Sequence, residues 1–147
     1  MNRTREQHRA QHALKFVKEY VRNQSQCSEN KAKMHTHIQK APIQILQNGL
    51  GQMLAFLLAD NEGKKDDKKK PSGILYAHLE EWLCGNPQPD YPCRVYPNDP
   101  TQVKQKELIE QLVAGNQNQY ILAQQETLAL FAWLKKFAAA WLNEGEK

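Results

Sequence analysis

The chain has 147 residues, which suits one domain built around a single hydrophobic core. Apolar residues make up 40% and charged residues 24%, a balance that fits a folded, soluble protein better than a disordered one. No stretch approaches the roughly 18 uninterrupted apolar residues of a membrane-spanning helix. Gln and Asn are abundant and β-branched residues are few, so helices are favoured over strands.

The net charge of +4 is distributed unevenly along the chain. Residues 1–40 contain nine Lys or Arg and three Glu, a net charge of +6, which leaves −2 for the remaining 107 residues. A basic N-terminal third on a nearly neutral body indicates an anionic partner, although a solvated helix face explains the same charge equally well.

The three cysteines, Cys27, Cys84 and Cys93, are an odd number and form no C-x-x-C pair. This pattern argues against a disulfide framework or a zinc site and favours reduced thiols in the cytoplasm. The first residues lack the apolar run of a signal peptide. We therefore expect a cytoplasmic protein that needs no metal and no cofactor.

Residues 3 to about 24 predict one amphipathic helix. Its apolar side is formed by Ala10, Ala13, Leu14, Val17, Tyr20 and Val21. The other side carries Arg5, His8, Arg9, His12, Lys15, Lys18 and Arg22. Only Glu6 and Glu19 dilute this basic side, and the mixed i,i+4 charges typical of a merely solvated helix are missing, which favours anion binding.

The next segments predict a helix over 28–40, a short helix over 42–47 opened by Pro42, and a further helix over 50–60. The last of these is apolar nearly all round, which is typical of a central, buried helix. The sequence "IQILQNGLGQMLAFLL" (43–58) runs across the boundary between the last two of these helices. It lacks the preceding strand and the third glycine of a dinucleotide loop, and it lacks the Gly-Lys-Ser/Thr of a phosphate loop. We interpret Gly49 and Gly51 as a joint that ends one helix and lets another approach closely.

Two long polar loops separate the remaining helices. Residues 61–73 hold five lysines and no apolar residue, and we interpret them as a solvated loop rather than a nucleic-acid contact. Residues 85–100 contain five prolines. Helices are predicted over about 74–84, over 100–114 after an N-cap at Asp99, and over 117–143. The chain as a whole predicts an all-α, compact bundle of six to seven helices in a single domain over 1–147.

No group of residues has the spacing of a catalytic or metal site. A helix splays His35 and His37 apart, and no carboxylate lies near them in sequence. His8 and His12 share one helix face, but the arginines around them repel a cation. We expect these two histidines to contact phosphate or to be solvated.

Four segments, in this order, resemble one protein family. They are "NRTREQHRAQHA" (2–13), "QNGLGQMLAFLL" (47–58), "ILYAHLEEWL" (74–83) and "AQQETLALFAWLKKFAAAWL" (123–142). Together they are similar to the small subunit of the type III-B CRISPR effector, the Cmr complex. The Lys-rich and Pro-rich loops contribute nothing to the resemblance.

The resemblance implies a small all-helical ribonucleoprotein subunit of antiviral defence, without an active site of its own. Copies of such subunits stack in a filament along the duplex of guide RNA and target RNA, beside other subunits of the Cmr complex. Duplex RNA is contacted mainly through phosphates and 2′-hydroxyls, which suits a basic helix face. The candidate RNA-binding residues are Arg3, Arg5, Arg9, Lys15, Lys18, Arg22, Lys40, Lys135 and Lys136.

Two other functions compete with this one. A helical protein-interaction adaptor unrelated to CRISPR would use an apolar patch such as Phe56 with Ala55 and Ala59. A small RNA-acting enzyme would use His8 and His12 and would cleave RNA on its own, whereas we expect no cleavage.

Overall fold

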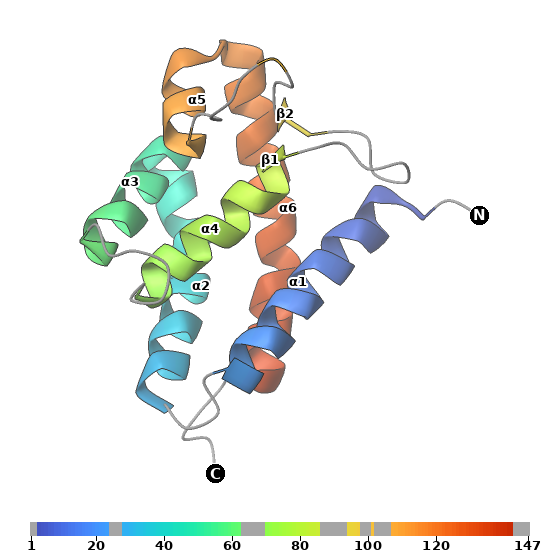
Figure 1. The fold of residues 1–147 in the computed structure, drawn as a ribbon, viewed down its shortest axis with the longest axis vertical. Helices are drawn as coiled ribbons and strands as arrows, with labels where there is room; N and C mark the ends of the chain where they lie inside the picture. Colours follow the sequence, from blue (N-terminus) through green and yellow to red (C-terminus); the bar gives the residue numbers. More distant parts are fainter. Residues whose placement is uncertain are drawn as a thin grey trace.

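Six helices and one very short pair of strands make up the part of the chain described by the computed structural model (Figure 1). The described residues are 3–23, 28–62, 70–85, 94–97, 101 and 107–142. The elements are α1 (Arg5–Asn23), α2 (Ser28–Asn48), α3 (Leu50–Asn61), α4 (Pro71–Leu83), β1 (Cys84–Gly85), β2 (Tyr96–Pro97), α5 (Leu108–Ala114) and α6 (Gln117–Trp141). The prediction of an all-α fold is confirmed. Within the described residues, no helix is both long enough and apolar enough to cross a membrane.

Helix α1 begins at a capping box, in which the Thr4 hydroxyl accepts from the Gln7 N–H and the Gln7 side chain accepts from the Thr4 N–H. It packs mainly against α6, and in Figure 1 the two helices descend side by side and cross. Ala13, Val17 and Tyr20 are buried, as the apolar periodicity predicts.

Helix α2 is continuous through Pro42, so the predicted break between 40 and 42 is wrong. A proline inside a helix removes one backbone hydrogen bond and costs about 3 kcal/mol. Ile38, Ala41 and Ile45 lie at helical spacing on both sides of Pro42, and all three are buried in the core. Packing of this shared face keeps the two segments in one helix despite the proline.

The joint between α2 and α3 is a tight contact with α6. Gly49 has φ 91°, and a Cβ built there would lie 2.8 Å from the Tyr120 hydroxyl. The first N–H groups of α3 are already bonded to α6, since Leu50 donates to the Gln124 side chain at 3.0 Å and Gly51 to the Tyr120 hydroxyl at 3.0 Å. The interpretation of Gly49 and Gly51 as a packing joint is therefore confirmed. The N–H groups of Leu50 and Gly51 are both occupied and cannot bind a phosphate.

Helix α3 is not buried all round, contrary to the prediction. Leu50, Met53, Leu54 and Leu57 are buried, but Phe56 is 45% exposed, and the neighbouring Ala55 and Ala59 are exposed as well. The main contacts of α3 are with α2, α4 and α5. Figure 1 shows it at the edge of the bundle, on the side away from α1.

The elements after α3 differ from the prediction mainly at their ends. Helix α4 begins at Pro71, in the first turn, rather than at residue 74. Helix α5 begins at Leu108 with Glu107 as its N-cap, and the N-cap predicted at Asp99 lies outside the described residues. The parallel pairing of β1 with β2 was not predicted. Most of the Lys-rich and Pro-rich loops, and the predicted end of the last helix at 143, also lie outside the described residues.

Buried side chains from all six helices form one hydrophobic cluster. Its large, fully buried members include Met34, Ile38, Leu54, Leu75, Leu79, Leu108 and Phe131. The inner side of α4 is formed by Leu75, His78, Leu79, Trp82 and Leu83, which are all buried. Cys84 is a free, buried thiol whose pKa burial raises to about 12, which makes it an inert core residue.

Candidate nucleic-acid interface

The predicted basic surface lies on α1, and the structure keeps most of its cations in solvent. Lys15, Lys18 and Arg22 are exposed, and the Arg5 side chain is 51% exposed. The Lys18 ammonium lies 4.9 Å from the centre of the Trp141 ring, a cation–π contact with the end of α6. These four cations are available to an anionic partner along the whole length of α1.

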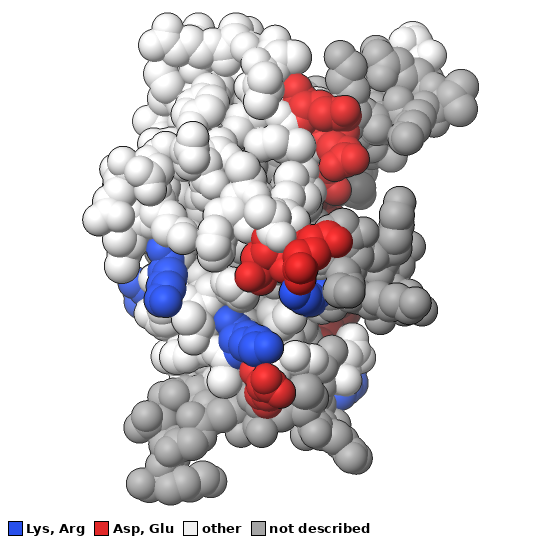
Figure 2. All heavy atoms as spheres, turned by 90° about the vertical axis from the view of Figure 1, so that its left-hand side faces the viewer, with Lys and Arg blue, Asp and Glu red and all other residues white. Residues whose placement is uncertain are grey.

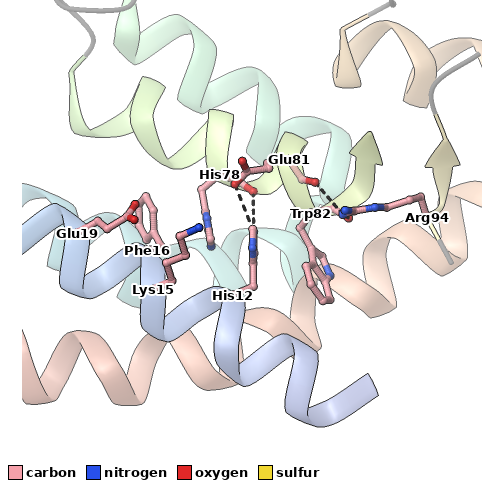
Figure 3. Close-up of a pocket in the computed structure, with 8 residues that line it drawn as sticks. All are labelled: His12, Lys15, Phe16, Glu19, His78, Glu81, Trp82 and Arg94. Carbon is pink, nitrogen blue, oxygen red and sulfur yellow. Dashed lines mark hydrogen bonds and ion pairs between the residues drawn. The ribbon is translucent and has the colours of Figure 1, made fainter. Parts of the chain in front are cut away.

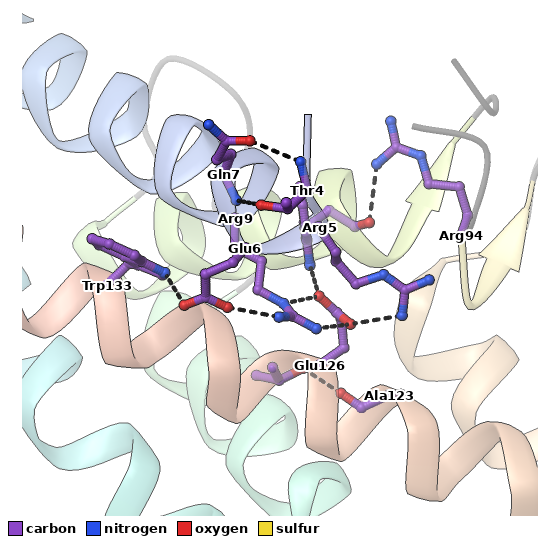
Figure 4. A network of polar contacts seen from close by, with 11 residues as sticks. Thr4, Arg5, Glu6, Gln7, Arg9, Arg94, Ala123, Glu126 and Trp133 are labelled. Carbon is purple, nitrogen blue, oxygen red and sulfur yellow. Dashed lines mark hydrogen bonds and ion pairs between the residues drawn. The ribbon is translucent and has the colours of Figure 1, made fainter. Parts of the chain in front are cut away.

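Arg9 is used differently, because it belongs to a polar network that holds α1 against α6 (Figure 4). Its Nε and NH2 groups donate to the two carboxylate oxygens of Glu126 at 2.7 and 3.0 Å. Its NH1 group donates to Glu6 at 2.9 Å, and Glu6 also accepts from the Trp133 indole at 2.7 Å. Ion pairs are therefore present in the first two turns of α1. In these turns, the prediction of a basic helix face that forms no ion pairs is wrong.

Glu126 is the centre of this network. Its side chain is only 10% exposed, and it also accepts from the Trp82 indole of α4 at 3.1 Å, with the Arg5 guanidinium 3.8 Å away. Burial by itself would raise the pKa of Glu126, but the hydrogen bonds and charge of Arg9 and the Trp82 N–H outweigh it and hold the pKa below its usual value. One carboxylate thus joins α1, α4 and α6.

Sequence reasoning did not single out Glu126, although its position carried a signal. It follows Ala123 by three residues and precedes Leu130 by four, so it lies on the buried side of α6. An acidic residue on a buried helix side requires a partner, and a basic helix with one-sided charge supplies it.

His8 and His12 do not lie on the solvated basic side, contrary to the prediction. His8 is 8% exposed. His12 stacks on His78 of α4 with 4.1 Å between ring centres and an interplanar angle of 10°, and it also contacts Trp82 at 4.9 Å (Figure 3). Burial lowers the pKa of His12 to about 4 and that of His78 well below its ordinary value, so both rings are neutral near pH 7.

The other candidate residues occupy varied settings. The Arg3 guanidinium donates to the Gln11 side chain. Lys40 on α2 and Lys136 on α6 are exposed, whereas Lys135 is half-buried. Figure 2 shows the side of the molecule that carries α3, where acidic and basic side chains are mixed among uncharged ones. That side therefore carries charges of both signs (Figure 2).

Comparison with known proteins decides the family. A family model described as CRISPR-associated protein (Cas_Cmr5) matches residues 5–141, which is nearly the whole chain. The chain belongs to the Cmr5 family. Members of the Cmr5 family are small subunits of the type III-B CRISPR effector, so the resemblance drawn from the four sequence segments is confirmed, and an adaptor unrelated to CRISPR is excluded.

A solved structure of the Cmr5 family agrees with this assignment. The chain is similar to a CRISPR-associated Cmr5 family protein from Thermus thermophilus, whose crystal structure aligns with a TM-score of 0.66 at 26% sequence identity. The alignment covers 96% of this chain and 100% of the other. The helical bundle is therefore the Cmr5 fold.

Proposed function

We propose that this Cmr5-family chain is a non-catalytic subunit that holds the guide RNA–target RNA duplex through the exposed cations of α1, in a filament of its own copies beside other Cmr subunits. The observation that carries the proposal is the row of solvent-exposed Arg5, Lys15, Lys18 and Arg22 along one helix. Phosphate contacts of this kind do not depend on base sequence, which a subunit serving many guides requires.

The nine candidate residues are expected to contribute unequally. Arg9 stays in the set, but two carboxylates already occupy its guanidinium, so we expect a smaller direct share from it. Arg3, Lys40, Lys135 and Lys136 are secondary contacts in this proposal. The single domain over 1–147 and the cytoplasmic location stay predictions.

Exposed apolar side chains support the protein contacts of the proposal. Ile43 and Leu46 on α2 are 53% and 73% exposed, and Phe56 on α3 is 45% exposed. Large exposed apolar side chains on a subunit of an assembly are suited to contacts with neighbouring subunits. A second copy of this chain and other Cmr subunits are the expected neighbours.

The RNA contact is tested in the assembled effector complex. We expect the triple variant Lys15→Gln, Lys18→Gln, Arg22→Gln to weaken target-RNA binding and to reduce the slope of log affinity against log salt by roughly 0.7–0.9 per lost contact. Lys33→Gln is the matched control, because the Lys33 ammonium on α2 is already 3.4 Å from the Glu29 carboxylate. A wild-type salt slope in the triple variant, with assembly intact, would refute the proposed RNA contact.

The non-catalytic role has its own test. Isolated wild-type chain incubated with target RNA is expected to leave it intact, and cleavage lost on His12→Gln substitution would contradict the proposal.

A further inference from the structure

A pocket of about 270 Å³ lies between α1 and α4 (Figure 3). Of the proposed RNA-binding residues, Lys15 alone lines it. Its wall is a stack of rings in which His78 lies between Phe16 and His12, at 4.0 and 4.1 Å between centres. Glu81 comes from the next turn of α4, and its side chain is 75% exposed. The imidazoles of His12 and His78, which are 66 residues apart in sequence, thus lie close to the carboxylate of Glu81.

We propose that His12, His78 and Glu81 bind one divalent transition-metal ion of the zinc type at the joint between α1 and α4. One ligand atom from each residue lies within 4.8 Å of the other two, and the His12 Nε2 to Glu81 Oε1 distance is 4.0 Å. Three atoms so placed lie within about 2.8 Å of a common point, whereas zinc bonds to nitrogen and oxygen measure about 2.0–2.2 Å. Shifts of roughly 0.6–0.8 Å per ligand would bring the three atoms to these distances, in addition to a change in ring orientation.

A second observation also points to a ligand. The Nε2 atom of His78 is fully buried and has no hydrogen-bond partner among the described residues. A buried polar atom without a partner costs about 1–3 kcal/mol, and a metal bond removes that cost. The two rings are stacked and almost parallel, so one of them must tilt for both in-plane lone pairs to point at the same ion, and the His12 Nε2 must give up its 3.4 Å contact with the His78 carbonyl oxygen.

The charges around the pocket decide which metal fits. Glu19 and Glu81 are balanced by Lys15 and Arg94, so the rim is neutral overall and offers little Coulomb attraction to a cation. Mg²⁺ and Ca²⁺ depend on such attraction and on oxygen ligands, whereas imidazole nitrogen favours Zn²⁺, Ni²⁺ and Cu²⁺. The site is therefore expected to take Zn²⁺ with micromolar affinity and to reject Mg²⁺. The ion would fasten α1 to α4.

The test is titration of the full chain with Zn²⁺ after removal of trace metals by a chelator. We expect one Zn²⁺ per chain by calorimetry, a midpoint of thermal unfolding several degrees higher at about a 100-fold excess over the dissociation constant, and no response to Mg²⁺. His12→Gln and Glu81→Gln should weaken binding at least tenfold and remove the thermal shift. His35→Gln is the matched control, because His35 lies on α2 and bonds to Gln39 instead.

Two results would overturn the site. One is wild-type affinity in both His12→Gln and Glu81→Gln, the second of which changes an exposed side chain and is expected to leave the fold intact. The other is a strong thiolate-to-metal absorption band on Co²⁺ substitution, because it would place the ion on cysteine. A weak visible spectrum without that band, lost in Glu81→Gln, would support the site.

Discussion

Breaking the ion pair between Arg9 and Glu126 is expected to destabilise the chain strongly. Two short hydrogen bonds, at 2.7 and 3.0 Å, join the side chains, and the exposed fractions are 18% for Arg9 and 10% for Glu126. Loss of one partner from a buried pair costs about 3–5 kcal/mol, because the remaining charge is left without compensation. Since Arg9 keeps some contact with water, we expect the lower end, about 3 kcal/mol for Arg9→Met.

A double-mutant cycle separates this pair from its surroundings. Arg9→Met, Glu126→Met and the double variant would be unfolded in urea and followed by far-UV circular dichroism. The bond from Trp82 to Glu126 is lost in both variants that lack the carboxylate, so it cancels in the cycle. We expect a coupling free energy of at least about 2 kcal/mol between Arg9 and Glu126.

The exposed pair of Glu29 and Lys33 on α2 provides the matched control. Its charged groups are 3.4 Å apart, but the side chains are 77% and 57% exposed, and such pairs contribute about 0.3–0.5 kcal/mol. If the Arg9–Glu126 coupling were no larger than that of this control pair, the assignment of Glu126 as the buried centre joining three helices would be wrong.

Two further outcomes follow from the same contacts. Gly49→Ala is expected to cost about 1–3 kcal/mol, because φ is 91° and the new Cβ would lie 2.8 Å from the Tyr120 hydroxyl. Gly51→Ala, where the nearest contact would be 3.6 Å, should be neutral or stabilising by about 0.5–1 kcal/mol, so equal urea midpoints for the two variants would refute this explanation. The lowered pKa of Glu126 stabilises the fold fully above the ordinary Glu pKa of about 4.3, and this contribution is lost as the pH falls through the lower folded pKa. Urea unfolding between about pH 6 and 3 should therefore show a smaller loss in Glu126→Gln than in wild type.

Apolar periodicity predicted which side of each helix is buried, but not what covers it. The inner side of α1 was predicted correctly because a helix repeats every 3.6 residues whatever it packs against. The bond from Arg9 to Glu126 spans 117 residues, and the stacking of His12 on His78 spans 66. No local pattern encodes contacts at such separations, so the basic side of α1 looked uniformly solvated when part of it is not.

Local rules also failed where packing outweighed them. Pro42 predicted a helix boundary, yet the buried face of Ile38, Ala41 and Ile45 continues through it. Helix α3 was predicted to be buried nearly all round because it is rich in apolar residues, although Phe56 on it is 45% exposed. In both cases the decisive quantity is the apolar area that neighbouring helices cover, which the local sequence does not contain.

Polar contacts contribute more to the packing of α1 than to that of α4. This links the two proposed roles of α1, RNA binding and metal binding. The apolar side chains that α1 buries are Ala13, Val17 and Tyr20, whereas α4 buries three leucines, a tyrosine and a tryptophan. The bonds of Arg9 to Glu126 and the stacking of His12 on His78 hold α1, which carries the exposed cations, against α6 and α4. Arg5 lies 3.8 Å from Glu126 at the edge of this network, where an RNA phosphate and the carboxylate would compete for the same guanidinium. The position of the proposed RNA-binding cations therefore depends on the largely buried pair of Arg9 and Glu126.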